Sequence, residues 1–138
     1  MQAGVSFAKL DFEAGERFVP MRRELGIETF GLNLMVLEPG QAGRIHRHER
    51  QEEAYVVLEG TLTLELEGGE VHTLTRGDAA RVAPDIRRQL SNRGEERVAL
   101  LAMGGAEPHA GRDGVAFLSW DDTEGKPPRD VPLPDDAA

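Results

Sequence analysis

Short strands separated by glycine-rich turns are the feature that most constrains the fold of this chain. Within residues 61–67, Leu62, Leu64 and Leu66 alternate with polar residues, which is the period of a strand with one buried face. The Gly-Gly pair at residues 68–69 then predicts a hairpin turn. Further short runs resemble strands, at residues 31–37, 54–58, 71–74, 79–83, 87–92 and 97–103. Strands of this length and spacing predict an all-β sandwich or barrel.

The length of 138 residues fits one domain. We expect residues 1–118 to form this single β-barrel domain. Residues 119–138 hold four of the eight prolines and six acidic residues against two basic ones. We therefore expect an irregular, acidic, proline-rich C-terminal tail, with Trp120 anchoring its start. No long amphipathic pattern predicts a helix, although residues 21–26 fit one helical turn as well as a strand.

The charge and hydropathy of the chain disfavour two classes of partner. A net charge of −9 would repel a phosphate backbone. No apolar run approaches the roughly 18 residues of a membrane span, and charged residues from Lys9 onward interrupt the N-terminus before a leader's apolar core forms. We therefore expect a cytoplasmic protein with no nucleic-acid or membrane partner. Glycine-rich nucleotide-binding motifs and the Gly-x-Ser-x-Gly motif are missing, so we expect no organic cofactor.

Two histidines and a glutamate are the strongest candidates for chemistry. His46 and His48 are two positions apart, so on a strand their side chains share one face, roughly 6.5 Å apart. Glu53 follows after a short turn. Two imidazoles and one carboxylate form the ligand set of non-haem metal sites that keep open positions. Glu52 is the second choice for the carboxylate, and the lack of cysteine excludes thiolate ligands and disulfides.

The spacing of these residues resembles the first motif of the cupin superfamily. The motif reads Gly, five residues, His-x-His, three or four residues, Glu, six residues, Gly. The matching positions here are Gly40, His46, His48, Glu53 and Gly60. The resemblance implies a small single-domain, cupin 2-like protein. Its fold would be a double-stranded β-helix, or jelly-roll barrel, with the motif core at about residues 31–103 and a pocket inside the barrel. It also implies a homodimer paired through an edge strand, to which the segment before Gly31 would contribute.

The second cupin motif matches only in part. It reads Gly, five residues, Pro-x-Gly, two residues, His, three residues, Asn, and Gly77 and Asn92 match it in register. Ala83 and Asp85 depart from it, and Arg88 stands where the family has its third histidine. A guanidinium has no lone pair to give a metal. Arg88 would therefore either pair with a glutamate and fill the space of the metal, or bind the anionic group of a substrate.

Two functions from different classes follow from these residues. In the first, His46, His48 and Glu53 bind Fe, Mn, Ni or Zn, and the protein is an oxygenase-like or isomerase-like enzyme that acts on a small molecule. In the second, a metal-free barrel binds a small ligand without catalysis, and Arg88 neutralises Glu53. A third and weaker hypothesis is that the chain is a sensor fragment. Tyr55 should share the interior face with Glu53 and either contact the ligand or pack in the core. His72 and His109 are expected to lie outside the site.

Overall fold

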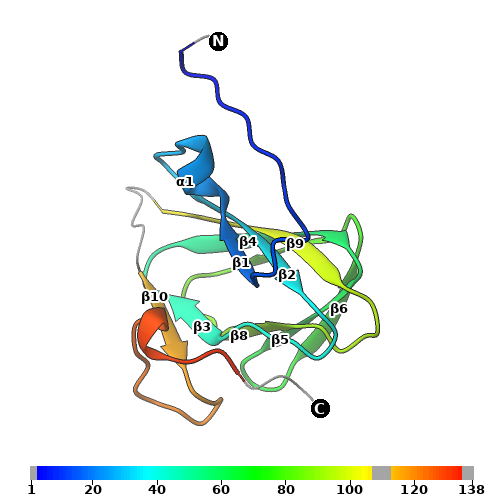
Figure 1. The fold of residues 1–138 in the computed structure, drawn as a ribbon. Helices are drawn as coiled ribbons and strands as arrows, with labels where there is room; N and C mark the ends of the chain where they lie inside the picture. Colours follow the sequence, from blue (N-terminus) through cyan, green and yellow to red (C-terminus); the bar gives the residue numbers. More distant parts are fainter. Residues whose placement is uncertain (1–2, 107–112, 135–138) are drawn as a thin grey trace.

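Two five-stranded antiparallel sheets face each other in this computed structural model, which describes residues 3–106 and 113–134 (Figure 1). One sheet has the order β1-β2-β9-β4-β7 and the other β10-β3-β8-β5-β6. The first sheet contains β1 (Phe18–Pro20), β2 (Gly31–Leu37), β9 (Val98–Gly105), β4 (Glu52–Glu59) and β7 (Ala79–Val82). The second contains β10 (Gly114–Phe117), β3 (Ile45–His48), β8 (Arg88–Ser91), β5 (Thr61–Leu66) and β6 (Val71–Thr75). The all-β barrel of two sheets predicted from the sequence is confirmed.

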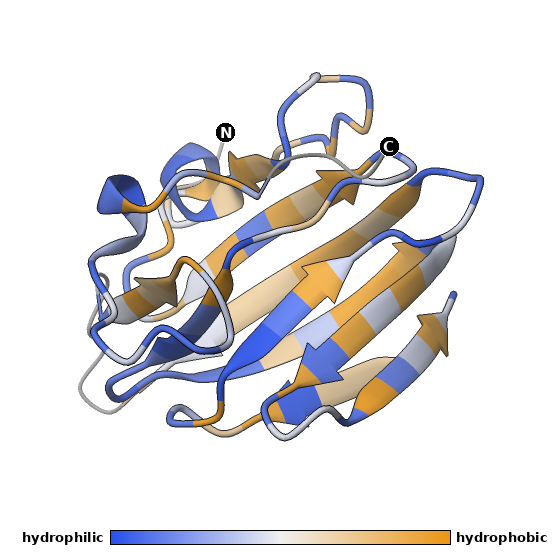
Figure 2. Ribbon diagram, turned by 90° about the horizontal axis from the view of Figure 1, so that it is seen from below, coloured by the Kyte–Doolittle hydropathy of each residue, from blue (hydrophilic) through white to orange (hydrophobic). Residues whose placement is uncertain are grey.

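The alternating leucines of β5 behave as their pattern predicts. β5 and β6 form an antiparallel hairpin, in which Leu62 pairs with Leu74. Leu62 and Leu64 are buried, and they join the core between the sheets. Figure 2 shows hydrophobic and hydrophilic residues alternating along these strands. The core that results is almost wholly aliphatic, with Met35, Leu37, Val57, Val98 and Leu100 among its buried members.

The turn from β4 into β5 depends on Gly60, the last residue of the first motif. Its φ is 80°, in the left-handed region that favours glycine. A Cβ atom at this position would lie 2.2 Å from the carbonyl oxygen of Arg97. The glycine therefore lets the turn lie directly against the start of β9.

The first 30 residues contribute one short helix and one edge strand. Residues 21–26 resolve into the helix α1 (Met21–Leu25), which ends at Gly26 in the left-handed conformation. Met21 packs on Leu34 and Val36, on the outer face of β2. The segment before β1 extends away from the barrel (Figure 1), and Phe7 is largely exposed. The only α-helix among the described residues has five residues, whereas a membrane-spanning helix needs about 20.

Residues 119–134 return to the barrel beside β3. Ala116 and Lys126 exchange two backbone hydrogen bonds, of 2.7 and 2.9 Å. The 3₁₀-helix η1 (Pro128–Asp130) follows, and then Val131, which is buried. Arg44 donates from Nε to the carbonyl oxygen of Val131 at 2.6 Å. These contacts hold the segment along β10. The division of the chain into a barrel domain of residues 1–118 and a tail of residues 119–138 stays a prediction.

Candidate metal centre

Three strands bring the candidate ligands and Arg88 together between the sheets. His46 and His48 lie on β3, and because side chains alternate along a strand both point to the inner face. Glu53 lies near the start of β4, in the opposite sheet. His46 pairs with Arg88 of β8, which places Arg88 beside the histidines, in the position of the missing third histidine. Tyr55, two residues after Glu53 on β4, completes the group.

The two histidines converge on the carboxylate of Glu53. His46 Nε2 lies 3.2 Å from Oε1, and His48 Nε2 lies 3.2 Å from Oε2. One ligand atom from each of the three residues falls within 4.8 Å of the others, which makes them a group that could hold an ion. Their side chains are 20%, 14% and 12% exposed, respectively. The cluster is therefore largely withdrawn from solvent but not sealed.

The other nitrogen of each ring also faces an acceptor. His46 Nδ1 lies 3.2 Å from the carbonyl oxygen of Arg44, and His48 Nδ1 lies 2.9 Å from Oδ1 of Asp113. A neutral imidazole has one N–H and can satisfy only one of its two acceptors. With the proton on Nδ1, the lone pair of Nε2 points at a carboxylate oxygen, which repels it. A cation between the Nε2 atoms and Glu53 removes that conflict, as does a second proton on each ring.

One atom of the cluster fits a metal ion particularly well. His48 Nε2 is buried and has no well-aligned hydrogen-bond partner among the described residues, although Glu53 lies at ion-pair distance. A buried polar atom left in this state costs free energy unless something else binds it. The residues present therefore fit a divalent ion with two nitrogen ligands and one oxygen ligand.

Arg88 is fully buried and its guanidinium is held by the protein. Nε donates to the hydroxyl oxygen of Tyr55 at 3.1 Å, and NH1 donates to the carbonyl oxygens of Pro84 and Ile86. NH2 lies 3.3 Å from Glu53 Oε1, but without the alignment of a hydrogen bond. Arg88 thus points inward and lies against one oxygen of Glu53. The other oxygen, Oε2, faces His48 Nε2.

Burial and charge shift the pKa of three groups in the cluster. Burial alone would raise the pKa of Glu53, but the hydrogen bond with His46 and the positive charge of His46 and His48 hold it well below its usual value. Burial would lower the pKa of His48, yet the negative charge of Glu53 close to Nε2, helped by the hydrogen bond to Asp113, raises it. Burial and the charge of Glu53 raise the pKa of Tyr55 well above its usual value. Tyr55 therefore keeps its proton at neutral pH, and its hydroxyl donates a hydrogen bond to Glu53 Oε1.

The remaining candidates from the sequence lie elsewhere or outside the described residues. The side chain of Glu52 is 58% exposed and pairs with Arg81 at 2.8 Å, so it points away from the histidines. His72 is on the surface, 3.0 Å from Glu70. His109 lies outside the described residues. Asp113 is the site residue that the sequence reasoning missed, because it follows the motifs and carries no spacing signal of its own.

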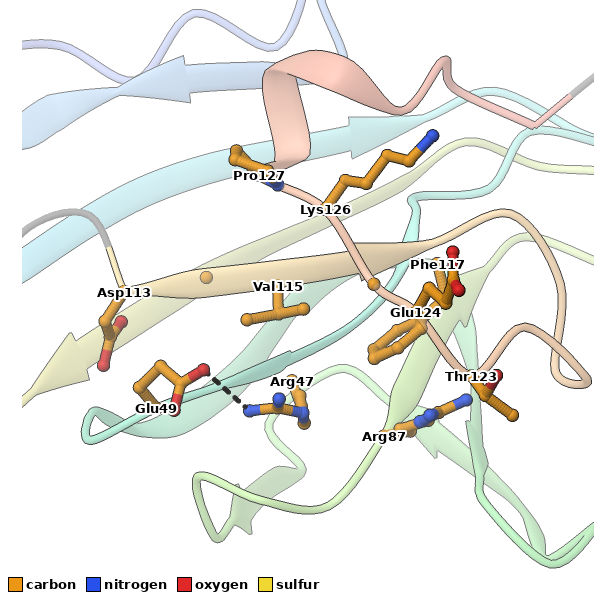
Figure 3. Close-up of a pocket in the computed structure, with 12 residues that line it drawn as sticks. Arg47, Glu49, Arg87, Asp113, Val115, Phe117, Thr123, Glu124, Lys126 and Pro127 are labelled. Carbon is orange, nitrogen blue, oxygen red and sulfur yellow. Dashed lines mark hydrogen bonds and ion pairs between the residues drawn. The ribbon is translucent and has the colours of Figure 1, made fainter.

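Two hollows flank β3. A cavity of about 50 Å³ lies beside His46, Glu53 and Tyr55, with Met35, Leu90 and Ala102 among its apolar lining residues. A second, open cleft of about 430 Å³ lies on the outer face of the strand, where Arg47, Glu49, Arg87 and Phe117 line it (Figure 3). The guanidinium of Arg87 lies 3.6 Å over the ring of Phe117. Asp113 lies at one end of this cleft and contacts His48, so it connects the outer face with the candidate centre.

Comparison with known proteins agrees with this architecture. A family model described as a cupin domain matches residues 33–104. A cupin protein from Bacteroides fragilis is 23% identical with a TM-score of 0.66, over 76% of this chain and 86% of its own. A cupin-superfamily sugar phosphate isomerase from Silicibacter pomeroyi is 28% identical with a TM-score of 0.61, over 86% and 80%. A putative sugar phosphate isomerase from Acidithiobacillus ferrooxidans is 25% identical with a TM-score of 0.60, over 72% and 62%. No match was found among curated proteins.

Proposed function

The chain belongs to the cupin superfamily, and we propose that it binds a divalent metal ion and acts on a small anionic or oxygenated molecule. His46, His48 and Glu53 would hold the ion, with Fe, Mn, Ni and Zn as the candidates for this ligand set. The observation that carries the proposal is that each ring has acceptors on both of its nitrogens. A cation at the Nε2 side lets both rings stay neutral with their protons on Nδ1.

The surrounding residues have distinct tasks in such a centre. Tyr55 donates a hydrogen bond to Glu53 Oε1, and Arg88 lies on the same side of the carboxylate. Together they fix the rotation of the carboxylate and turn Oε2 toward His48. The apolar residues that line the small cavity exclude bulk water, which strengthens electrostatic interactions inside it. A divalent ion bound there would act as a Lewis acid on an oxygen atom of the substrate.

Charge favours an anionic substrate. With neutral imidazoles, Arg88 cancels the charge of Glu53, and Asp113 beside His48 offsets one of the two charges of a bound divalent ion, so one positive charge would remain. A carboxylate or phosphate ligand would neutralise it. The two sugar phosphate isomerases that resemble this chain support a phosphorylated or carboxylated substrate and isomerase-like chemistry. A sugar phosphate is much larger than the cavity of about 50 Å³, so most of such a substrate would lie at the rim beside Phe18 and Arg44.

Metal analysis tests the proposal. Protein without a His tag, purified without chelating resin, would be incubated with each of the four ions, desalted and analysed for metal. We expect about one equivalent of at least one ion, because a divalent ion displaces the protons of its histidine ligands when it binds. Glu53→Gln should bind at least about tenfold less, and the matched control Glu52→Gln should bind like the parent. Less than about a tenth of an equivalent of every ion in the parent protein would overturn the proposal.

The second candidate function is a metal-free, non-catalytic ligand-binding barrel. The full burial of Arg88 and its approach to Glu53 at 3.3 Å favour it, since this pair supplies a cation beside the carboxylate without a metal. Arg88→His separates the two functions. If the parent protein binds no metal and the variant gains it, the metal-free function is supported. If the parent already binds an ion, the metal-dependent function stands.

A further inference from the structure

Asp113 contacts the candidate centre from outside the matched family region. It directly precedes β10, whereas the family model ends at residue 104. β10 pairs with β3 so that Gly114 lies opposite His48. Asp113 is therefore next to the end of β3, and it is only 9% exposed. A buried carboxylate in this place needs partners for its charge.

Three groups bind the side chain of Asp113. Oδ2 accepts the backbone N–H groups of Arg50 and Gln51, both at 2.7 Å. Oδ1 lies 2.9 Å from Nδ1 of His48. The two backbone hydrogen bonds fix the carboxylate to the turn between β3 and β4. The same turn connects the histidines with Glu53, so the backbone that positions Oδ1 of Asp113 also positions the candidate ligands.

We propose that Asp113 is the positioning residue of His48. Its carboxylate accepts a hydrogen bond from the Nδ1–H group of His48. This hydrogen bond selects the tautomer whose Nε2 lone pair faces Glu53, and it fixes the orientation of the ring. Outer carboxylates act on metal-ligating histidines in this way, by fixing the tautomer and raising the basicity of the ligand. The consequence for metal binding rests on the proposed function, whereas the tautomer of His48 is a property of the metal-free protein. The C-terminal part of the chain would thus complete a site whose ligands all lie in the matched region.

Asp113→Asn tests this role, because asparagine can keep two of the three interactions. Its amide oxygen can accept the N–H groups of Arg50 and Gln51, which places the NH₂ group opposite His48 Nδ1. An NH₂ group donates, so the variant favours the other tautomer, with the proton on Nε2 and no lone pair there for a metal. We expect ¹⁵N NMR of the metal-free variant, at a pH at which the His48 ring is neutral, to show the proton on Nε2 instead of Nδ1. Metal affinity should fall by about 10- to 100-fold.

Asp122→Asn is the matched control. The carboxylate of Asp122 also accepts two backbone N–H groups, from Leu118 and Glu124, both at 3.0 Å. It lies in the same part of the chain, but its carboxylate binds Leu118 and Glu124, whereas His48 faces Asp113 and Glu53. We expect this variant to keep both the tautomer of His48 and the metal affinity of the parent protein.

The outcomes separate this inference from the proposed metal site. A folded Asp113→Asn variant with an unchanged His48 tautomer would overturn it, as would an equal loss of affinity in Asp122→Asn. The parent protein gives a test that does not depend on folding of a variant: above the titration of the ring, metal-free His48 must carry its proton on Nδ1, and a proton on Nε2 overturns the inference. If the parent binds no metal but shows the Nδ1 tautomer, the positioning role is supported while the proposed function fails.

Discussion

Arg88→Met removes the only positive charge that is permanently buried beside Glu53 among the described residues. Methionine keeps an unbranched side chain but loses the ion pair at 3.3 Å and the hydrogen bonds to Tyr55, Pro84 and Ile86. Removing one member of a buried ion pair costs about 3–5 kcal/mol, because the other charge is left behind. Protonation of His48, whose pKa is raised, offsets part of this cost, so we expect the lower end, about 3 kcal/mol. For a domain of this size that corresponds to a decrease in Tm of roughly 10–15 °C.

Added metal should reverse part of that loss. A divalent ion at His46, His48 and Glu53 supplies a cation to the same carboxylate, so the ion should raise the Tm of Arg88→Met more than that of the parent protein. Thermal unfolding followed by circular dichroism, with and without saturating Zn²⁺, measures both effects. Arg81→Met is the matched control, because Arg81 is 66% exposed and pairs with the exposed Glu52. A surface pair of this kind contributes at most about 1 kcal/mol.

Two results would refute this reasoning. A loss of stability in Arg88→Met no larger than that in Arg81→Met would mean that the buried charge of Glu53 does not depend on Arg88. An equal rise in Tm on adding Zn²⁺ to the parent and to Arg88→Met would mean that the ion and Arg88 do not act on the same carboxylate. The second result would not affect the predicted loss of stability in Arg88→Met. It would contradict only the prediction that Arg88 and the metal ion both neutralise Glu53.

Two further predictions concern the same cluster. Tyr55→Phe should lower stability by about 1–3 kcal/mol in urea unfolding, because Glu53 and Arg88 each lose a buried hydrogen bond; a loss well below this range would show that the hydroxyl is dispensable. The metal-free protein should be most stable between about pH 4.5 and 6.5 in thermal melts. The lowered pKa of Glu53 adds stability that is lost as the pH falls below this window, and the raised pKa of His48 adds stability that is lost above it. A maximum at alkaline pH would contradict the second prediction.

The ligand cluster could be predicted because it depends on local geometry. The alternation of side chains puts His46 and His48 on one face of any strand that contains them. A short turn then returns the chain, so Glu53 reaches the opposite sheet within a few residues. The same local logic predicted the hairpin of β5 and β6, where the alternating leucines and the glycine pair are adjacent in sequence.

Asp113 could not be predicted in this way, because its contact joins residues 65 positions apart. The contact requires β10 to pair with the edge of β3. Neither the hydrophobic periodicity nor the turn residues of a sequence predict which strand pairs with a given edge. The segment after β10 is similar. Its many prolines and acids predict irregular structure, but they do not show that Val131 is buried or that its carbonyl oxygen binds Arg44. Long-range pairing decides both cases.

At the position of the third histidine of the cupin motif, Arg88 gives this site a fixed positive charge in place of a neutral imidazole. A neutral histidine in this place would add a fourth ligand, and the centre would then hold its ion more tightly. A guanidinium adds a fixed charge instead, which opposes a cation and attracts an anion. Arg88 approaches Oε1 of Glu53, the oxygen that also faces His46, whereas Oε2 faces His48. We therefore expect weaker binding of the metal alone than in a centre with a fourth neutral ligand, and a marked increase in affinity when an anionic ligand binds with it.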